Sequence, residues 1–408
     1  MNRPKPHLQI VRSDSAAFAI ADQLCMVGAN FVLTILVARH SSQEDFATFS
    51  ILYSLVVLLS FLHGPLINEP LALSSRNDTS LLSGFRADRA TALIFVPIST
   101  LIVVFAYSQQ YSASPLTLSL LCAAGITSCA YWSAKSGLHA LSKHRAAFVA
   151  SAIGSAALVA TGAAGIAYCY SMVDFALAAI SIAALSGYIT AQLFLRHSAS
   201  PQLKLSVVAS HSRIGIPAAS LVWLAGNVTA LALANQERLE EVAGLRVVLT
   251  LLLPINQIMT GMSSFLLPRL ARLRGGGLSS AAQESTSKVL LAGTALSIAF
   301  AAFTYPFAGF LLERIYGADY IRYRAWLQIG AAVLPLSWTV VTVLRTHFRG
   351  SAQATLLLKV YIACLVIALP VSLVILQSDL QIGPIVSFIT IQAILALGFL
   401  LTFVRTRS

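Results

Sequence analysis

Residues 18–40 read FAIADQLCMVGANFVLTILVARH, a stretch that is apolar enough to cross a lipid bilayer although it contains Asp22, Gln23 and Asn30. A helix of about 20 residues spans the hydrocarbon core, because each residue adds about 1.5 Å across roughly 30 Å. Lipid cannot solvate a carboxylate or an amide, so these three side chains need protein or water as neighbours. The stretch therefore predicts a membrane helix with a polar face that is turned away from lipid.

Similar apolar stretches recur along the whole chain of 408 residues, which is 57% hydrophobic and only 10% charged, with a mean hydropathy of +0.79. A soluble domain needs more charged residues to cover its surface. The runs are continuous rather than alternating, which argues against a β-barrel. We therefore expect an all-α polytopic membrane protein with about twelve transmembrane helices. They cover residues 16–38, 46–68, 89–108, 115–134, 146–169, 173–195, 214–236, 243–267, 288–311, 325–347, 352–376 and 383–404.

The formal charge of +12 is distributed unevenly between the two sides of the predicted membrane. With both termini on one side, 20 Lys and Arg residues fall on that side, Lys135 among them, and six fall on the other side, Arg246 among them. Cytoplasmic loops carry the excess of positive charge in membrane proteins. This pattern predicts that both termini are cytoplasmic. Topology accounts for the basic charge, so we expect no nucleic-acid partner.

Two stretches of the chain resemble each other and predict two related halves. Residues 29–52 read ANFVLTILVARHSSQEDFATFSIL, and residues 226–249 read GNVTALALANQERLEEVAGLRVVL. Asn30 aligns with Asn227, and Glu44 aligns with Glu240 after a one-residue gap. Two six-helix lobes of the same orientation are typical of transporters whose lobes rock around a central cavity. The expected division is a cytoplasmic segment 1–15, a first lobe 16–200, a second lobe 201–404 and a cytoplasmic tail 405–408.

The sequence offers little that is typical of an enzyme. It contains no Gly-rich phosphate loop, no G-x-S-x-G and no H-E-x-x-H, and its eight histidines are scattered. We expect no catalytic residue, no cofactor and no metal. The alternative of a membrane glycan polymerase or ligase requires a long external loop, and only residues 312–325, LERIYGADYIRYRA, offer anything similar.

Polar residues inside the predicted spans are the candidates for a functional site. At 100° per residue, Gln23 and Asn30 lie about 20° apart on the helix and Asp22 lies about 80° from Asn30, so all three fit one stripe. The candidates that line a cavity or contact the cargo are Gln23, Asn30, Asn227, Asn256 and Gln257. Other interpretations stay open, because asparagines also bond neighbouring helices and Asp22 can lie at the interface.

The first 60 residues of the predicted membrane region resemble a known family. The matching parts are ADQ at 21–23, NF at 30–31, AR at 38–39, EDFATFSIL at 44–52 and EP at 69–70. They are similar to the O-antigen and exopolysaccharide flippases of the multidrug/oligosaccharidyl-lipid/polysaccharide exporter superfamily. Relatives have two glycines in the loop after the Ala-Arg pair. This chain has ARHSSQEDFA there and lacks both, which leaves open whether a tight turn forms.

This resemblance implies a flippase that moves a polyprenyl-pyrophosphate-linked oligosaccharide across the bacterial inner membrane for surface polysaccharide biosynthesis. The partners to expect are the lipid-linked oligosaccharide, membrane lipids, H⁺ or Na⁺, and a polysaccharide polymerase. The basic residues to consider for pyrophosphate contact are Arg39, Arg345 and Lys359, although Arg345 also fits a topological charge and Lys359 a snorkelling side chain. Asp22 is the candidate for ion coupling. The alternative within the superfamily is a cation-coupled exporter of drugs or other small molecules.

Overall fold

The structure is a computed structural model, which describes residues 13–70, 85–108, 114–141, 143–168, 171–196, 202–203, 205–275, 277–350, 353–378 and 380–406. Within these ranges the chain forms twelve long helices. Residues 1–12 of the expected segment 1–15, the end of the tail and most of the loop between residues 69 and 88 lie outside the described residues, and residues 13–15 already belong to the first helix. The expected helices are all present, and most of them extend beyond the predicted ranges by a few residues.

The first half of the chain contains six of the long helices. They are α1 (Ser13–His40), α2 (Gln43–His63), α4 (Ala87–Ser108), α5 (Pro115–Ala140), α6 (His144–Tyr168) and α7 (Met172–Leu195). A π-helical turn, η1 (Gly64–Asn68), continues α2. Two strands of two residues each, β1 (Phe85–Arg86) and β2 (Gln202–Leu203), pair antiparallel, with Phe85 opposite Leu203.

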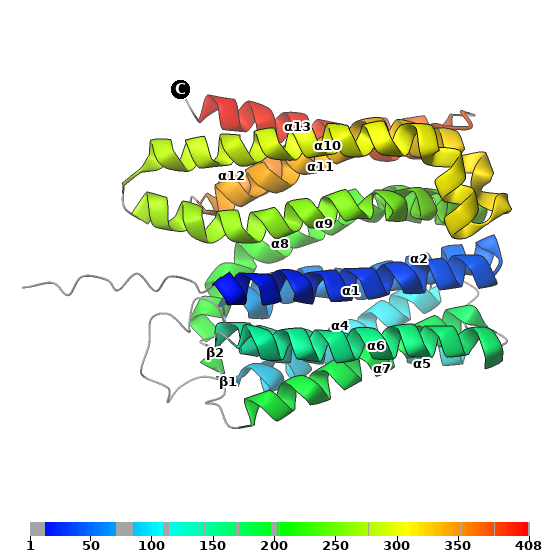
Figure 1. The fold of residues 1–408 in the computed structure, drawn as a ribbon, viewed down its shortest axis with the longest axis horizontal. Helices are drawn as coiled ribbons and strands as arrows, with labels where there is room; N and C mark the ends of the chain where they lie inside the picture. Colours follow the sequence, from blue (N-terminus) through cyan, green and yellow to red (C-terminus); the bar gives the residue numbers. More distant parts are fainter. Residues whose placement is uncertain are drawn as a thin grey trace, which may run out of the picture.

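The second half contains the other six. They are α8 (Leu205–Asn235), α9 (Leu239–Gly275), α10 (Ser279–Tyr316), α11 (Arg324–Gly350), α12 (Ala354–Gln377) and α13 (Gly383–Arg405). A short 3-10 helix, η2 (Ala318–Tyr323), leads into α11. In Figure 1 the helices run side by side along the long axis, with α9–α13 on one side of the molecule and α1, α2 and α4–α7 on the other.

These helices confirm the expected fold class. Eleven segments are long and apolar enough to cross a membrane, and the helix Thr91–Ala106 is a shorter apolar one. The fold is that of an all-α polytopic membrane protein with twelve helices in two six-helix lobes. The exact residue at which one lobe ends and the other begins stays a proposal.

The turn between α1 and α2 forms without the two glycines of the family pattern. Only Ser41 and Ser42 separate the two helices. The Ser42 hydroxyl accepts a hydrogen bond from the backbone N–H of Asp45 at 3.0 Å and so caps α2. A tight turn therefore forms here without glycine, and the serine cap stabilises the start of α2.

Small residues allow the helices of the first lobe to approach closely. Gly154 of α6 faces α7 so closely that a Cβ atom there would lie 3.0 Å from the carbonyl oxygen of Ala183. Helix interfaces within membranes commonly use such residues, because packing rather than hydrophobic burial joins the helices. In this way α6 packs against both α1 and α7, and it carries residues of the site described below.

Helix α2 joins the two lobes by packing against α8 and α9 as well as against α5 and α7. Near its middle, the indole Nε1–H of Trp223 on α8 donates to the carbonyl oxygen of Ser54 at 2.8 Å. Toward one end, Arg322 of η2 donates to Gln43 of α2. Toward the other end, Arg349 of α11 pairs with Glu69, which follows η1. We call this contact region between α2 and helices α8 and α9 the seam.

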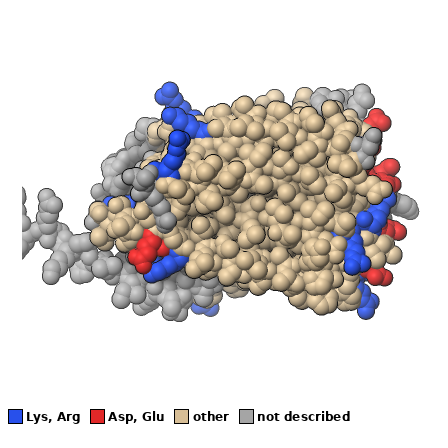
Figure 2. All heavy atoms as spheres, turned by 90° about the horizontal axis from the view of Figure 1, so that it is seen from above, with Lys and Arg blue, Asp and Glu red and all other residues tan. Residues whose placement is uncertain are grey.

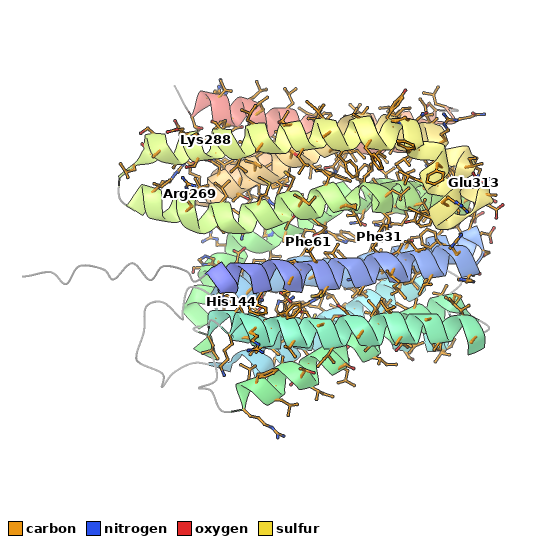
Figure 3. All side chains as sticks on the ribbon, viewed as in Figure 1. Phe31, Phe61, His144, Arg269, Lys288 and Glu313 are labelled. Carbon is orange, nitrogen blue, oxygen red and sulfur yellow. The ribbon has the colours of Figure 1, made fainter. Side chains whose placement is uncertain are left out.

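Charged side chains gather at the two ends of the molecule. On the face shown in Figure 2, Lys, Arg, Asp and Glu cluster at both ends, and a broad band without charge lies between them. Figure 3 places Arg269, Lys288 and His144 at the end where α1 begins, and Glu313 at the other. We call the first the basic end and the second the opposite end. The band without charge is the part that lipid would surround.

Two basic residues do not follow the sequence interpretation. Lys135 was expected in a loop on the cytoplasmic side, but it lies inside α5 and is buried. Arg246 was expected in an external loop, but it lies inside α9, seven residues after the helix begins, or about 10 Å along its axis. The prediction for Lys135 was wrong because a helix boundary read from hydropathy stops early at a charged residue. Counting Arg246 with the external charges was wrong because this residue already falls inside the predicted span 243–267.

Candidate functional site

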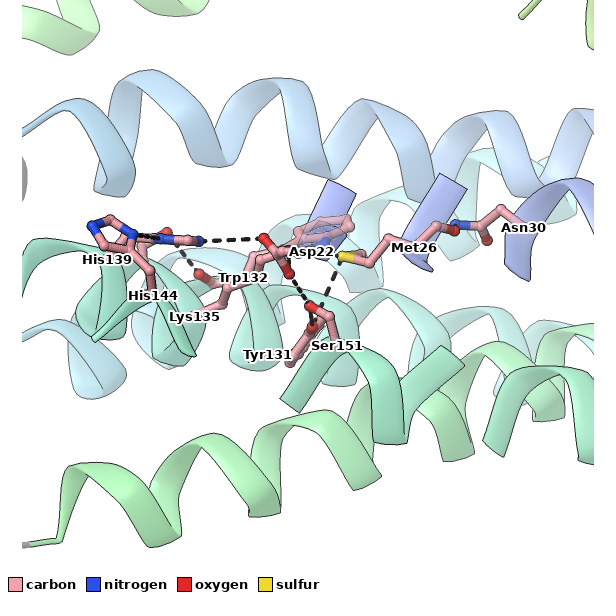
Figure 4. A network of polar contacts seen from close by, with 10 residues as sticks. Asp22, Met26, Asn30, Tyr131, Trp132, Lys135, His139, His144 and Ser151 are labelled. Carbon is pink, nitrogen blue, oxygen red and sulfur yellow. Dashed lines mark hydrogen bonds and ion pairs between the residues drawn. The ribbon is translucent and has the colours of Figure 1, made fainter. Parts of the chain in front are cut away.

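A buried cluster of polar side chains surrounds Asp22. The Asp22 side chain is only 1% exposed, and its Oδ1 atom lies 2.8 Å from the ammonium nitrogen of Lys135. The Ser151 hydroxyl donates to the same oxygen, and Tyr131 Oη lies 2.6 Å from Ser151 Oγ. Figure 4 shows the carboxylate between these groups. The cluster thus contains an acid and a base that neutralise each other in a region from which water is excluded.

Three helices bring this cluster together. Asp22 lies on α1, Ser151 on α6, and Tyr131 and Lys135 on α5. Tyr131, Lys135 and His139 are spaced four residues apart, so they project from one face of α5. Removing one partner of such a pair would leave an uncompensated charge, which is far costlier than removing both. The ion pair therefore links α1 to α5 through side chains, while α1 itself packs mainly against α6.

Two histidines extend the cluster toward the basic end. His139 Nε2 lies 3.4 Å from Asp22 Oδ2, and its side chain is 33% exposed. Its Nδ1 atom lies 3.3 Å from Nδ1 of His144, the first residue of α6, and the two rings are 5.5 Å apart. The sequence interpretation that the histidines are scattered is wrong for this pair, because residues 139 and 144 flank the short turn between two antiparallel helices.

An open cavity of about 570 Å³ adjoins the cluster within the first lobe. Helices α1, α2, α5, α6 and α7 form its wall. Ser151 and Tyr131 belong both to the wall and to the Asp22 cluster, and Asn30 and Tyr53 form part of the wall farther from Asp22. A change at Asp22 can therefore alter the shape or the polarity of this cavity directly.

A second polar group lies on the seam. The Tyr53 hydroxyl of α2 donates to Asn30 Oδ1 at 3.1 Å. On the other side of the seam, Arg246 Nη2 donates to Asn227 Oδ1 at 3.3 Å and to the carbonyl oxygen of Ser50 on α2 at 3.2 Å. Among the ion pairs that the described residues form, none involves Arg246. The seam thus contains an arginine that is held by neutral oxygens rather than by a carboxylate.

The two asparagines that align between the halves have matching environments. The Nδ2 group of Asn30 donates to the carbonyl oxygen of Met26 at 2.9 Å, and that of Asn227 donates to the carbonyl oxygen of Trp223 at 2.8 Å. Each side-chain oxygen then accepts from the next helix of its own lobe, from Tyr53 in the first lobe and from Arg246 in the second. This correspondence supports the alignment of the halves.

The same alignment relates Ser50 to Arg246, because both lie six residues after the aligned glutamates, Glu44 and Glu240. These two aligned positions touch each other across the seam. Residues that a twofold relation exchanges can touch only near its axis. Arg246 therefore lies near the pseudo-twofold axis, where a path between the lobes would run.

The other predicted site residues lie apart from these groups. Gln23 is exposed on α1 and does not share the buried environment of Asp22. Arg39 is exposed at the last turn of α1. Asn256 and Gln257 are half-buried on α9, which continues through Pro254. The predicted stripe on α1 therefore holds for Asp22 and Asn30, which face protein, and not for Gln23.

The two basic candidates of the second lobe also differ in their surroundings. Arg345 of α11 is half-buried beside the buried Tyr361 of α12. Lys359 of α12 is exposed, as a snorkelling side chain would be. Neither residue contacts the Asp22 cluster or the seam group among the interactions described above. Their role in cargo binding stays a prediction.

Sequence reasoning missed Lys135, His139, Ser151, Tyr53 and Arg246. For Lys135 and His139 a signal was available, since their spacing of four residues continues the face of α5 beyond the predicted helix end. For Arg246 the signal was its position inside the predicted span 243–267. Ser151 and Tyr53 gave no signal, because a lone hydroxyl in an apolar helix also bonds its own backbone.

The stretch 312–325, the one candidate for an external enzymatic loop, is a packed helical corner. It covers the end of α10, all of η2 and the start of α11. Tyr316, Tyr320 and Tyr323 are buried there, and the Tyr323 hydroxyl donates to the backbone oxygen of Glu240 at 2.7 Å. This corner braces α9 in the second lobe.

Comparison with known proteins shows the fold alone. No protein-family model matches this sequence, and no curated protein matches it. Among solved structures, a mutant form of the MATE transporter VcmN of Vibrio cholerae is similar with a TM-score of 0.71 and 12% identity, covering 96% of this chain and 95% of that chain.

Other similar structures come from the same superfamily. A MOP superfamily transporter from Pyrococcus furiosus has a TM-score of 0.72 and 14% identity, covering 100% of this chain and 98% of that chain. A multidrug resistance MATE family transporter in an outward-facing conformation has a TM-score of 0.69 and 15% identity, with coverage of 100% and 98%. An inward-facing conformation of such a transporter has a TM-score of 0.66. The chain therefore has the fold of MOP superfamily transporters over its whole length.

The ion pair makes a prediction about stability. Lys135→Met leaves the Asp22 carboxylate buried without its cation, and we expect a loss of about 3–5 kcal/mol in the free energy of unfolding. The double variant Asp22→Asn with Lys135→Met removes both charges and should recover most of this loss. Thermal unfolding of the purified protein in detergent measures both. The control Lys359→Met removes an exposed lysine and should have little effect. Equal melting temperatures for the single and double variants would contradict the pairing.

Proposed function

We propose that this chain is a membrane transporter that exports its cargo by alternating access between the two lobes and couples export to protons at the Asp22 cluster. One observation carries the proposal. The buried cluster shares Ser151 and Tyr131 with the wall of the cavity in the first lobe. A change in protonation beside Asp22 therefore acts on the cavity without an intermediary.

The charges of the cluster suit the reversible binding of one proton. With Asp22 ionised, Lys135 charged and His139 neutral, the three side chains sum to no net charge. One added proton gives the cluster a net charge in a region of low dielectric, where charge interactions are strong. Such a change alters which hydrogen bonds Ser151 and Tyr131 prefer to make. Moving one charge across about 100 mV supplies roughly 2.3 kcal/mol, which is enough to drive such a cycle.

The same geometry favours H⁺ over Na⁺. Hard cations bind several oxygen ligands at once. At Asp22, Oδ1 already accepts from Ser151 and lies 2.8 Å from the Lys135 ammonium. A sodium ion there would meet a cation at close range, whereas a proton needs only an acceptor.

The contacts along the seam fit alternating access. Toward the opposite end, Arg322 of η2 contacts Gln43 of α2, and toward the basic end Arg349 contacts Glu69. These contacts join the lobes at both ends. In the proposed cycle one set separates while the other stays closed, so that the space between the lobes opens to one side at a time. The fold supports this cycle, since similar structures include outward-facing and inward-facing conformations.

We propose a small molecule as the cargo. Structures with this fold include multidrug resistance transporters, and the wall of the cavity in the first lobe combines apolar side chains with a few polar groups, as small-molecule sites usually do. We place the protein in a bacterial inner membrane with both termini in the cytoplasm, as the distribution of Lys and Arg predicts. Export then runs from the basic end to the opposite end.

The coupling role of Asp22 is tested in proteoliposomes with an imposed pH gradient, with ethidium as the probe cargo. Asp22→Asn, and the charge-balanced double variant Asp22→Asn with Lys135→Met, should abolish gradient-driven ethidium movement, because neither retains the paired carboxylate. The matched control Glu313→Gln changes an exposed acid at the opposite end and should transport normally. Full gradient-driven transport by the correctly folded double variant would refute coupling at this cluster.

The second candidate is the flippase for polyprenyl-pyrophosphate-linked oligosaccharide, and Arg246 favours it. An arginine without a carboxylate partner near the axis of the lobes is suited to a phosphate group, because guanidinium forms strong charge-assisted hydrogen bonds with phosphate. Moving a pyrophosphate through lipid alone is prohibitive, since an isolated charge costs many kcal/mol to transfer into low dielectric. A cationic cargo, in contrast, would be repelled by Arg246.

The effect of Arg246→Gln separates the two cargoes. For a pyrophosphate cargo, losing charge-assisted hydrogen bonds removes roughly 1.5–3 kcal/mol of binding free energy, about tenfold or more in affinity. Surface polysaccharide in the native host should then fall, while the control Arg314→Gln leaves it unchanged. For a cationic small molecule, Arg246→Gln should leave surface polysaccharide intact and should not weaken ethidium transport. Wild-type polysaccharide levels in a strain that carries only Arg246→Gln would rule out the flippase.

A further inference from the structure

We propose that His139 holds the exchangeable proton of the cluster and that His144 passes it to the basic end, so that the two histidines form the exit path of the coupling proton. This inference rests on the proposed function and deepens it, because it assigns the proton to a particular ring and gives it a route. Asp22 then acts as a positioning residue, which orients His139 and stabilises its charged form.

The contacts of Asp22 explain why the proton resides on the imidazole. The Asp22 carboxylate faces the Lys135 ammonium at 2.8 Å and accepts a hydrogen bond from Ser151. Donors directed at a carboxylate favour its ionised form. His139 Nε2 lies 3.4 Å from the second carboxylate oxygen, close enough for a protonated ring to pair with it. Imidazole is also the side chain that ordinarily exchanges a proton between about pH 5 and 8.

The arrangement of the two rings gives the proton a route. His139 Nδ1 and His144 Nδ1 lie 3.3 Å apart, so one of them donates while the other accepts. When His139 is charged, its Nδ1–H donates to a neutral His144. The proton then transfers to His144 Nδ1, and His144 releases its other proton from Nε2 to water. This leaves His139 neutral and His144 in its Nδ1–H tautomer, so one proton has moved from His139 to water, and His144 exchanges tautomers before it accepts the next proton from a recharged His139.

The position of His144 suits transfer rather than storage. His144 is half-buried and begins α6, and Figure 3 places it at the basic end. The N-terminus of a helix disfavours a positive charge, so a proton does not remain there. Figure 4 shows the path running from Asp22 through His139 to His144. The titratable and charged groups around this path, besides Asp22, are Cys25, Tyr131, Lys135, Lys143 and Arg145.

Infrared difference spectra of the purified full-length protein test where the proton binds, without any cargo. All eight histidines contribute imidazole bands, so the readout is an imidazole change between about pH 8 and pH 5 that occurs together with a shift of the Asp22 carboxylate bands. We expect His139→Gln to remove this joint change and the matched control His40→Gln to retain it. A protonated-carboxyl band that appears at low pH, persists in His139→Gln and disappears in Asp22→Asn would overturn the proposal, because the proton would then reside on Asp22.

Stopped-flow mixing with a soluble pH indicator tests the route. His144→Gln should retain the imidazole bands of His139 but slow proton release by roughly a hundredfold, the usual contribution of a positioned proton-transfer group. His40→Gln should release protons at the wild-type rate. An unchanged rate in His144→Gln would overturn the exit path.

The two measurements also separate this inference from the proposed function. If ethidium and polysaccharide assays fail while the imidazole bands and the slow release in His144→Gln are observed, the proton path stands and the transport proposal falls. If transport depends on the pH gradient but His139→Gln and His144→Gln behave as wild type in both measurements, export stands and this path is wrong.

Discussion

The structure depends on one constraint, which is that a charge surrounded by lipid must find its partner within the protein. The Asp22 carboxylate and the Lys135 ammonium satisfy each other at 2.8 Å, between α1 and α5. Removing one of them would leave a buried charge without compensation, which costs about 3–5 kcal/mol, as much as truncating a large buried apolar side chain. The pair therefore links α1 to α5 through side chains, although α1 packs mainly against α6. Through Ser151 the pair links α6 as well.

This pairing places an ionisable cluster next to the cavity of the first lobe. Ser151 and Tyr131 link the ion pair to the cavity, and Asn30 and Tyr53 link the cavity to the seam between the lobes. Tyr53 is also close enough to Arg246 for the two to interact electrostatically. Polar side chains thus lie on both sides of the cavity, with Ser151 and Tyr131 toward the Asp22 cluster and Asn30 and Tyr53 toward the seam. In the proposed function, a change on one side reaches the other through the wall of this cavity.

The sequence predicted the fold well because lipid imposes a strong and simple pattern. The twelve apolar stretches became helices, and Asp22 and Asn30 face protein because amides and acids are costly in lipid. The alignment of Asn30 with Asn227 pointed to equivalent environments on the seam. These predictions rest on properties of a single helix, which a sequence displays directly.

The site itself was only partly predictable, because it depends on which helices become neighbours. Lys135 was assigned to a loop, since a charge at the edge of an apolar run looks like a boundary until a partner is known. Arg246 was counted with the external charges although it falls inside a predicted span. The sequence did not predict the contact between His139 and His144, because this contact depends on the geometry of the turn between α5 and α6. The cargo depends on which side chains line the space between the lobes. The pattern of a single helix does not show which side chains these are.

We propose that the first lobe binds a proton near Asp22 and binds no sodium there. Charge displacement in liposomes on a solid-supported membrane measures this directly with the purified full-length protein and no cargo. A jump in pH should produce a transient current, because a proton enters part of the membrane field, and a jump in Na⁺ at constant pH should produce none. A current that follows Na⁺, or no current after the pH jump, would contradict the account.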